Sequence, residues 1–236
     1  SEIDGEEARR SYSICSVPGD PHLRVGVKKV ADGRFSRFVN EHLAVGQSMR
    51  VMTPEGRFTA LVGGRHDYLL AAAGSGITPM LSIARTVLGH EKESTITLIY
   101  GNRSTDTIMF LEELEDLKNR YPARFNLIHV LSREEQDVEL LSGRLDAERL
   151  DRILAAMVPV DTVDEWYLCG PFEMVTAARA RRAERVVDPR HGHLELCHVG
   201  DAPPPVRSEQ EVGADASAAT VTVNRDSKKH RIRLKA

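Results

Sequence analysis

A glycine-rich turn follows an apolar run in the first third of the chain. Residues 69–80 read LLAAAGSGITPM, and a helical pattern of apolar residues comes next. Glycine lets a backbone approach a bulky anion, and the first turn of a helix offers N–H groups and the positive end of a dipole. The pattern can hold a nucleotide pyrophosphate, although ordinary tight turns also contain short Gly-x-Gly runs. The residues that would line such a site are Gly74, Gly76, Ile77 and Thr78.

Polar residues follow two further apolar segments. Arg103 comes directly after one of them, and Ser132 and Arg133 come after the next. Because ligands of open α/β sheets bind at the carboxyl ends of the strands, both arginines are placed to reach an anionic nucleotide. The alternative is a pair of solvated loop arginines.

A third apolar segment ends in Cys169 and Gly170, directly before Pro171. The Gly-Pro pair predicts a sharp turn from strand to helix, where a small side chain would face a ligand. The alternative is an inert buried thiol, because cysteine is among the residue types most often buried.

The start of the chain combines a cation, an aromatic ring and hydroxyl groups in residues 9–16, which read RRSYSICS. Alternation along a strand puts Arg10 and Tyr12 on the same side. An arginine can fork onto phosphate oxygens, and a tyrosine ring can lie against a flat heterocycle. An ordinary edge strand is the alternative.

Gly33 and Ser36 come at the start of a short helical pattern at residues 36–43. Ser36 is predicted to be the N-cap of this helix, and the free N–H groups at that end could meet a second phosphate. Simple capping without a ligand is the alternative.

Two kinds of region must position these residues. Residues 11–62 are typical of β structure, with strand candidates at 23–30 and 49–52 around the short helix. From residue 66, strand and helix patterns alternate, which predicts right-handed crossovers and a parallel sheet covered on both faces. The expected strands lie at 68–73, 95–100, 125–131, 165–169 and 193–198, and the expected helices at 79–88, 110–120, 146–157 and 172–186.

The composition excludes several classes of protein. The net charge of −3 and the 5% content of aromatic residues argue against a nucleic-acid partner. No apolar run approaches the ~18 residues that span a membrane. Three distant cysteines offer neither a zinc site nor an iron–sulfur ligand set, and their sparse, odd count suits the reducing cytoplasm. The histidines at 191, 193 and 198 lack the spacing of a metal site, so no metal is expected.

The ordered set of motifs resembles the ferredoxin–NADP reductase superfamily over about residues 9–198. The motifs are Arg10-x-Tyr12-Ser13, Gly33-x-x-Ser36, Gly74-x-Gly76-Ile77-Thr78-Pro79 and Cys169-Gly170-Pro171. Residues 131–134 (LSRE), residues 143–145 (GRL) and a Pro-rich segment before a further β pattern are most similar to the reductases that serve phenylacetyl-CoA epoxidase.

The resemblance implies an α/β plus β fold: a partial antiparallel flavin-binding β-barrel, then an open parallel-sheet nucleotide-binding domain. The opening β-hairpin of a ferredoxin-like module would follow. The expected divisions are a barrel at 1–63, an NADP-binding domain at 64–199, a linker at 200–219 and the hairpin at 220–236.

The resemblance also implies roles for individual residues around FAD. Arg10 would hold its pyrophosphate, and Gly33 and Ser36 would complete that phosphate site. Tyr12 would pack on the isoalloxazine and Ser13 would hydrogen-bond near its N5. The flavin region would also contact the backbone of Ile14 and Cys15 and, near the end of the second domain, Glu195.

On the nicotinamide side, Gly74, Gly76, Ile77 and Thr78 would line the pyrophosphate path, and Cys169 and Gly170 would lie close to the nicotinamide. Arg103, Ser132 and Arg133 would bind the adenosine ribose and its 2′-phosphate, which favours NADPH over NADH. The catalytic set implied in this way is Tyr12, Ser13, Cys169 and Glu195.

Three features depart from the family pattern. Only nine residues precede Arg10, where relatives have a further β segment, and Cys197 stands where an aromatic residue often follows the acidic one. No four-cysteine set for a [2Fe–2S] cluster is present, so such a cluster is expected only in the full-length protein.

The function that follows is a flavin-dependent oxidoreductase that takes a hydride from NADPH and passes electrons to a multicomponent oxygenase, phenylacetyl-CoA epoxidase in the first instance. A reductase of a ring-hydroxylating or ketosteroid oxygenase is one alternative. A non-catalytic nucleotide-binding fragment is an alternative of another class, motivated by the short segment before Arg10.

Overall fold

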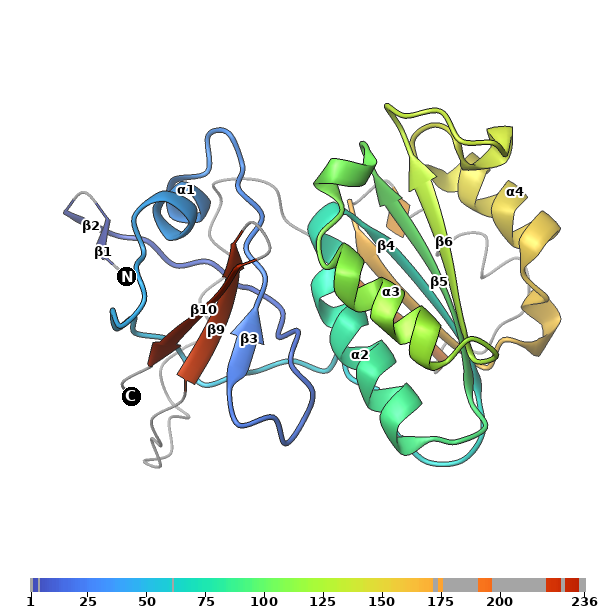
Figure 1. Cartoon of the computed structure of the whole chain (residues 1–236), viewed down its shortest axis with the longest axis horizontal. Helices are drawn as coiled ribbons and strands as arrows, with labels where there is room; N and C mark the ends of the chain where they lie inside the picture. The colour runs from blue at the N-terminus through green and yellow to red at the C-terminus, as the bar shows by residue number, and fades with distance from the viewer. Residues whose placement is uncertain are drawn as a thin grey trace. The chain divides into compact units, whose positions relative to one another are not determined.

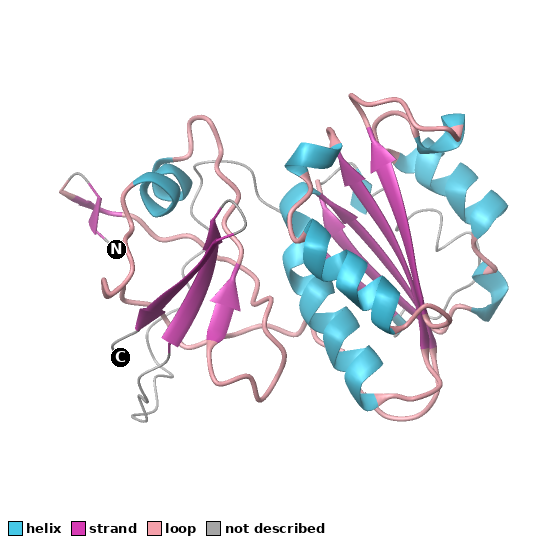
Figure 2. Ribbon diagram, viewed as in Figure 1, coloured by secondary structure: helices cyan, strands magenta, loops and turns pink. Residues whose placement is uncertain are grey.

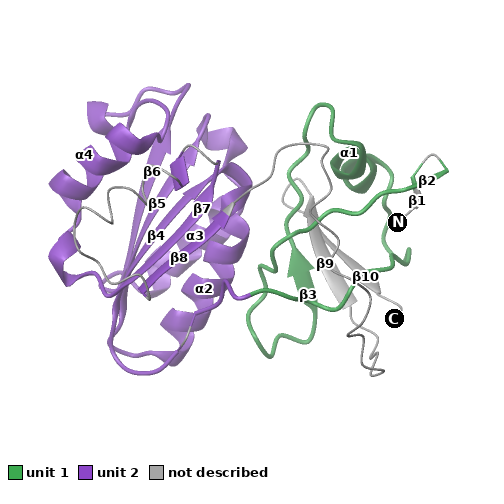
Figure 3. Cartoon of the chain, turned by 180° about the vertical axis from the view of Figure 1, so that it is seen from behind, with its two compact units in different colours: residues 1–56, 199–236 green, residues 57–198 purple. Residues whose placement is uncertain are grey.

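The computed structural model describes residues 2–3, 5–60, 62–171, 174–175, 191–196, 220–225 and 228–233. The chain forms two compact units, one of residues 1–56 with 199–236 and the other of residues 57–198 (Figure 3). The division after residue 56 lies a few residues before the expected one after residue 63, and residues 220–233 group with the first unit. Among the described residues, no helix has both the length and the apolar character needed to cross a bilayer.

A five-stranded parallel sheet forms the centre of the second unit (Figure 1). Its strands are β4 (Asp67–Ala73), β5 (Thr95–Asn102), β6 (Phe125–Leu131), β7 (Glu165–Gly170) and β8 (Gly192–Leu196). They lie in the order β6-β5-β4-β7-β8, so the predicted parallel sheet is confirmed. Five successive residues of β4 are buried, because layers cover both faces of the sheet.

Helices cover both faces of this sheet (Figure 2). They are α2 (Ile77–His90), α3 (Leu111–Arg120) and α4 (Ala147–Met157), and α2 and α3 lie on the face opposite to α4. Short 3₁₀ turns connect them: η1 (Gly74–Gly76), η2 (Thr105–Thr107), η3 (Glu139–Leu141) and η4 (Val160–Thr162). The expected helix at 172–186 lies largely outside the described residues, of which only 174 and 175 are helical.

Charge and burial explain where these helices begin and end. The Asp146 carboxylate caps α4 by accepting a bond from the Arg149 N–H at 2.9 Å. The first turn of α3 is acidic and its last turn is basic, which complements the helix dipole. Apolar residues of α4, including Leu150 and Ile153, pack on the sheet in one buried core.

The described residues of the first unit form two small sheets and one helix. Strands β1 (Glu2–Ile3) and β2 (Glu6–Glu7) pair with each other. Strand β3 (Leu23–Val25) pairs in parallel with β9 (Thr220–Arg225), which pairs antiparallel with β10 (Lys228–Arg233). The hairpin expected after residue 220 therefore forms, and it shares a sheet with β3. The helix is α1 (Arg34–Glu41).

Two details of the first unit differ from the sequence prediction. Strand β3 covers only the first three residues of the expected strand at 23–30, and residues 49–52 form no strand. Val51 and Met52 are exposed, and no neighbouring strand pairs with this segment within the described residues. Apolar alternation alone is misleading here, because a strand needs a ladder partner as well as a pattern.

Candidate functional site

The glycine-rich turn lies between β4 and α2, as predicted. Gly74 adopts a positive φ of 56°, a conformation that L side chains rarely adopt, and begins the short turn η1. A Cβ at position 76 would overlap the backbone carbonyl of Cys169. Only glycine at this position therefore lets the turn lie against the end of β7.

This contact is at the point where the strand order of the sheet reverses. The chain runs from β4 through β5 to β6 on one side, and β7 and β8 lie on the other side of β4. Ala72 is in register with Cys169, so the turn after β4 and the Cys169–Gly170 segment share one edge. In open α/β sheets, ligands bind outside the carboxyl ends of the strands at such a switch point.

The start of α2 carries no side-chain cap and no acidic residue in its first turn. The positive end of its dipole is thus suited to an anion, while the Ile77 N–H is bonded to the Gly74 and Ser75 carbonyls and Pro79 has no N–H. Ile77 and Thr78 are buried, and the Thr78 hydroxyl donates to the Ser75 carbonyl at 3.0 Å. Thr78 therefore stabilises the turn through its hydroxyl, whatever contact it makes with a ligand.

The loops that follow β5 and β6 lie side by side. The Arg133 N–H donates to the Arg103 carbonyl at 2.7 Å, and the Ser132 N–H donates to the Asn102 carbonyl at 3.0 Å. The side chains of Arg103, Ser132 and Arg133 are exposed. Neither guanidinium has a hydrogen bond or ion pair within the described ranges, so the adjacent loops at this edge each carry an arginine that no other described side chain neutralises.

Sequence reasoning missed a carboxylate that joins these loops. Glu134 accepts hydrogen bonds from the Thr105 N–H and from the Thr105 hydroxyl, each at 2.7 Å. The backbone N–H bond and then the hydroxyl bond lower the pKa of Glu134. Glu134 belongs to the LSRE segment, but nothing in that pattern indicates a partner in the preceding loop.

Cys169 and Glu195 lie on neighbouring strands. They are in register between β7 and β8, and Cys169 is buried whereas Glu195 is half-buried. Gly170 completes the end of β7, where a Cβ would come within 2.7 Å of Met174 Cε. Residue 197, the departure from the family pattern, lies outside the described residues.

In the first unit, the predicted flavin residues lie on the segment before β3. The Tyr12 ring is half-buried and packs on Phe35 of α1, with ring centroids 5.6 Å apart. Burial raises the pKa of Tyr12, against an opposing contribution from Arg10. The Arg10 guanidinium donates to the Arg9 carbonyl at 2.7 Å. Ser13 is half-buried and follows directly.

Ile14 and Cys15 attach this segment to β3. Ile14 forms a single antiparallel bridge with Val25, and the Cys15 N–H donates to the Arg24 carbonyl at 2.7 Å. The Cys15 thiol is fully buried and also donates to that carbonyl, at 3.2 Å. The Cys15 side chain therefore packs inward, and only its backbone is suited to a ligand contact.

The structure corrects the prediction for Ser36. The N-cap of α1 is Gly33, and Ser36 lies inside the first turn. The Ser36 hydroxyl donates to the Gly33 carbonyl and accepts from the Val30 N–H, each at 3.1 Å. A Cβ at Gly33 would overlap that hydroxyl. The hydroxyl therefore folds the chain back before the helix, and the helix start keeps N–H groups without a side-chain cap.

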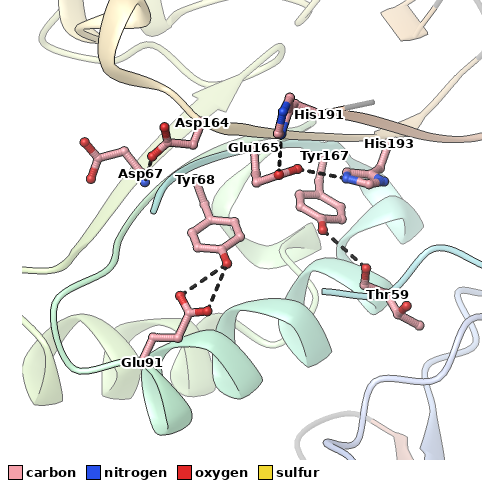
Figure 4. Close-up of polar contacts among 9 residues, drawn as sticks. All are labelled: Thr59, Asp67, Tyr68, Glu91, Asp164, Glu165, Tyr167, His191 and His193. Carbon is pink, nitrogen blue, oxygen red and sulfur yellow. Dashed lines mark hydrogen bonds and ion pairs between the residues drawn. The ribbon is translucent and has the colours of Figure 1, made fainter. Parts of the chain in front are cut away.

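A polar cluster lies at the opposite, amino-terminal edge of the parallel sheet (Figure 4). The Glu165 carboxylate contacts His191 Nδ1 at 2.7 Å and His193 Nε2 at 2.9 Å. His193 also stacks on Tyr167, whose hydroxyl donates to the Thr59 carbonyl at 3.2 Å. These contacts join β7 to β8. Within the described ranges, no group of three or more His, Cys, Asp or Glu side chains is arranged to hold a metal.

Two protein-family models match the chain. The oxidoreductase FAD-binding domain matches residues 1–60, and the oxidoreductase NAD-binding domain matches residues 70–180. The first match covers residues 1–56 of the first unit. The second covers the glycine-rich turn, both arginine loops and Cys169.

Curated relatives belong to multicomponent oxygenases. A component of 1,2-phenylacetyl-CoA epoxidase from Escherichia coli is 40% identical over 99% of this chain and 65% of the relative. The ferredoxin reductase component of 3-ketosteroid-9-alpha-monooxygenase from Mycobacterium tuberculosis is 34% identical over 98% of this chain and 61% of the relative. The chain thus spans somewhat less than two thirds of these relatives.

Solved structures support the fold. The FAD/NAD-binding domain of nitric oxide dioxygenase from Vibrio cholerae has a TM-score of 0.68 and 24% identity, covering 84% of this chain and 81% of that one. A ferredoxin–NADP⁺ reductase mutant from Plasmodium falciparum has a TM-score of 0.62 and 21% identity, covering 80% and 76%. The chain belongs to the oxidoreductases that have an FAD-binding and an NAD-binding domain, and its fold is like that of ferredoxin–NADP⁺ reductase.

Proposed function

We propose that this chain is the flavin- and nicotinamide-binding part of a reductase that takes a hydride from NADPH and supplies electrons to an oxygenase component. One observation carries the proposal. The glycine-rich turn, the uncapped start of α2 and the Cys169–Gly170 segment meet at the switch point of a parallel sheet. This is the arrangement that a dinucleotide requires.

The residues present fit a nicotinamide dinucleotide. The turn at Gly76 lies against the end of β7 in a space that a Cβ would fill, and the first turn of α2 offers N–H groups to a pyrophosphate. Arg103 and Arg133 add two guanidinium groups that the described part of the chain does not neutralise. A 2′-phosphate would neutralise this charge, and NADH has no such group, so we assign NADPH as the donor.

The first unit offers FAD the same kinds of group: N–H groups at a helix start and a cation for the phosphates. The start of α1 offers N–H groups after Gly33, with no side-chain cap and no acidic residue in the first turn. Arg10 supplies a cation for the pyrophosphate. Tyr12 presents an aromatic ring that packing on Phe35 orients. Because the Ser36 hydroxyl is already bonded to the backbone of the preceding residues, Ser36 would bind a phosphate through its own backbone.

Bound FAD supplies the chemistry, because it accepts a hydride and releases electrons singly. The chain binds and orients. Tyr12 would pack against the flavin ring, Ser13 would offer it a hydrogen bond, and the backbone of Ile14 and Cys15 would line the same region. Positioning of this kind accounts for much of the rate of a hydride transfer.

Cys169 and Gly170 would serve the nicotinamide side, and Glu195 the flavin region. Cys169 and Gly170 would lie close to the nicotinamide at the end of β7, where the Cys169 side chain is buried and Met174 packs beside Gly170. Glu195, on the neighbouring strand, supplies a carboxylate beside the reacting groups. These two strands are held together at their other ends by the Glu165 contacts.

We place the acceptor among multicomponent oxygenases, because a subunit of phenylacetyl-CoA epoxidase is 40% identical and a ferredoxin reductase component of a ketosteroid monooxygenase is 34% identical over nearly the whole chain. A [2Fe–2S] cluster is the carrier that we assign between flavin and oxygenase. The three cysteines of these 236 residues cannot supply the four thiolates of such a cluster. The sparse cysteines favour the cytoplasm as the site of action.

Phenylacetyl-CoA epoxidase is the first candidate for the oxygenase, and a ketosteroid monooxygenase is the second, in the order of the identities. An acceptor-exchange assay distinguishes them. The full-length reductase is mixed with each purified oxygenase component, and coupled substrate oxidation is measured. The component that supports turnover is the partner, and turnover with neither would remove both assignments.

The reductase activity is tested on the chain itself. After reconstitution with FAD, the protein is titrated anaerobically with NADPH and with NADH. We expect flavin absorbance that bleaches with NADPH at lower concentration than with NADH, and reduction of cytochrome c or dichlorophenolindophenol. A folded protein that binds NADPH but reduces neither acceptor with FAD present would instead be a nucleotide-binding module without turnover.

A further inference from the structure

Tyr100 connects strand β5 to the glycine-rich turn. Its side chain is fully buried, and its hydroxyl donates to the carbonyl oxygen of Gly74 at 2.9 Å. The register places Tyr100 opposite Ala72, two residues before Gly74. The bond therefore crosses from one strand to the first residue of the turn that follows its neighbour.

The Gly74 carbonyl is held from two sides. It accepts from the Tyr100 hydroxyl and from the backbone N–H of Ile77. The next carbonyl of the turn, that of Ser75, accepts from the Thr78 hydroxyl. Gly74 has the positive φ that sets the direction of its carbonyl. The carbonyl oxygens of Gly74 and Ser75, the first two residues of the turn, thus both accept hydrogen bonds from within the protein.

The direction of these carbonyls decides what the turn presents to a ligand. A carbonyl oxygen carries partial negative charge and repels a phosphate, whereas an N–H attracts it. A carbonyl bound to a fully buried hydroxyl is directed into the protein. The Ile77 N–H is bonded within the turn and Pro79 has no N–H, so the N–H groups that can face a ligand are those of the turn before Ile77, at a helix start with no side-chain cap and no acidic residue.

We propose that Tyr100 is a positioning residue: its hydroxyl fixes the Gly74 carbonyl inward, so that the glycine-rich turn presents N–H groups to the pyrophosphate of the nicotinamide dinucleotide. The inference rests on the proposed nucleotide site. Tyr100 itself touches no ligand, because its side chain is completely covered. Its effect on binding is transmitted through one backbone carbonyl.

The test compares two matched variants. Tyr100→Phe removes the bond to Gly74, and Tyr167→Phe removes a bond of the same kind, from a buried tyrosine hydroxyl to the Thr59 carbonyl, remote from the turn (Figure 4). Dissociation constants are measured by calorimetry for NADPH and for 2′P-AMP, which has one 5′-phosphate in place of the pyrophosphate. Melting temperatures are measured for all proteins.

We expect Tyr100→Phe to raise the dissociation constant of NADPH roughly threefold to tenfold, the effect of one neutral hydrogen bond. The constant for 2′P-AMP should change less than about twofold. Tyr167→Phe should lower the melting temperature by a similar amount and leave both constants unchanged. A role confined to stability would instead change the melting temperatures of both variants and neither constant.

Four results overturn the inference, the last of them in a substitute variant. Unchanged NADPH affinity in Tyr100→Phe removes the positioning role, and so does an equal loss in Tyr167→Phe. If the wild type binds neither NADPH nor NADH, the proposed function itself fails and the inference fails with it. Should Tyr100→Phe not fold, Thr78→Val removes the hydroxyl from the second carbonyl of the turn, and unchanged NADPH affinity in that variant would refute the mechanism.

Discussion

Glu134 and Thr105 connect the loop after β6 to the loop after β5. The Glu134 carboxylate accepts from both the N–H and the hydroxyl of Thr105, each at 2.7 Å. Each partner lies next to the arginine pair in sequence, since Thr105 is two residues after Arg103 and Glu134 directly follows Arg133. The contact therefore limits how far the two loops that carry Arg103 and Arg133 can separate.

Removal of this contact should weaken the binding of NADPH. In Glu134→Ala the loops lose two hydrogen bonds to a charged acceptor, so the arginines must be ordered by the ligand itself. We expect the dissociation constant for NADPH to rise roughly threefold to tenfold, with a smaller change for NADH. Glu135→Ala is the control, because this neighbouring side chain is exposed and its carboxylate has no hydrogen bond within the described residues. Equal effects of both variants would mean that net charge, and not the contact, controls affinity.

The same contact predicts a dependence on pH. The bonds from Thr105 lower the pKa of Glu134 in the folded protein. A carboxyl with a lowered folded pKa stabilises the fold above its unfolded value of about 4.3, and this contribution is lost as pH falls through the folded value. The difference in melting temperature between wild type and Glu134→Ala should therefore narrow as the pH falls below ~4.5. A difference that widens there would contradict the assignment, as would an NMR titration that gives Glu134 an ordinary pKa.

The sequence predicted the second unit better than the first, and the reasons are physical. Residues 69–80 show a local sequence pattern, because a strand buried on both faces needs an apolar run and the turn after it needs a glycine with a positive φ. The pairing of β3 with β9 shows no such local pattern in the sequence, because the two strands lie almost 200 residues apart. Ser36 was misassigned because its hydroxyl bonds back to Val30 and Gly33, a choice that local propensity does not encode.

Arg133 should determine the choice between NADPH and NADH. Its guanidinium is exposed and lies beside Arg103 through the backbone bond between the two loops. Loss of a charge-assisted contact corresponds to a roughly tenfold to hundredfold loss of affinity. Arg133→Ala should therefore raise KM for NADPH by that factor and leave KM for NADH nearly unchanged. Arg152→Ala, on the exposed side of α4, is the control for a lost positive charge. A parallel rise for both nucleotides would remove the 2′-phosphate assignment.

Gly76 and Gly89 provide a matched pair of substitutions at the start and near the end of α2. A Cβ at position 76 would overlap the Cys169 carbonyl, whereas a Cβ at position 89 would meet nothing within 4 Å. Gly76→Ala should cost about 1–3 kcal/mol in the free energy of unfolding and move the turn away from β7, with loss of NADPH binding. Gly89→Ala should stabilise the protein by about 0.4–1 kcal/mol and leave binding intact. Denaturant unfolding and calorimetry measure both effects, and normal NADPH affinity in Gly76→Ala would show that the close approach is not needed.

Tyr12 separates the effects of an aromatic ring from those of a hydroxyl on FAD binding. Burial raises the pKa of Tyr12, so the phenol is neutral at physiological pH, and its ring is held by Phe35. If ring packing orients the flavin, Tyr12→Phe should retain FAD, and Tyr12→Ala should raise its dissociation constant roughly twofold to tenfold. Phe38→Ala is the control, because Phe38 packs on the same small core without belonging to the proposed flavin residues. Fluorescence titration with FAD, well below the melting temperature of each variant, measures the constants. If Phe38→Ala loses as much affinity for FAD as Tyr12→Ala does, Tyr12 acts through the stability of this core. If Tyr12→Phe, which removes only the hydroxyl, already loses affinity for FAD, the effect belongs to the hydroxyl.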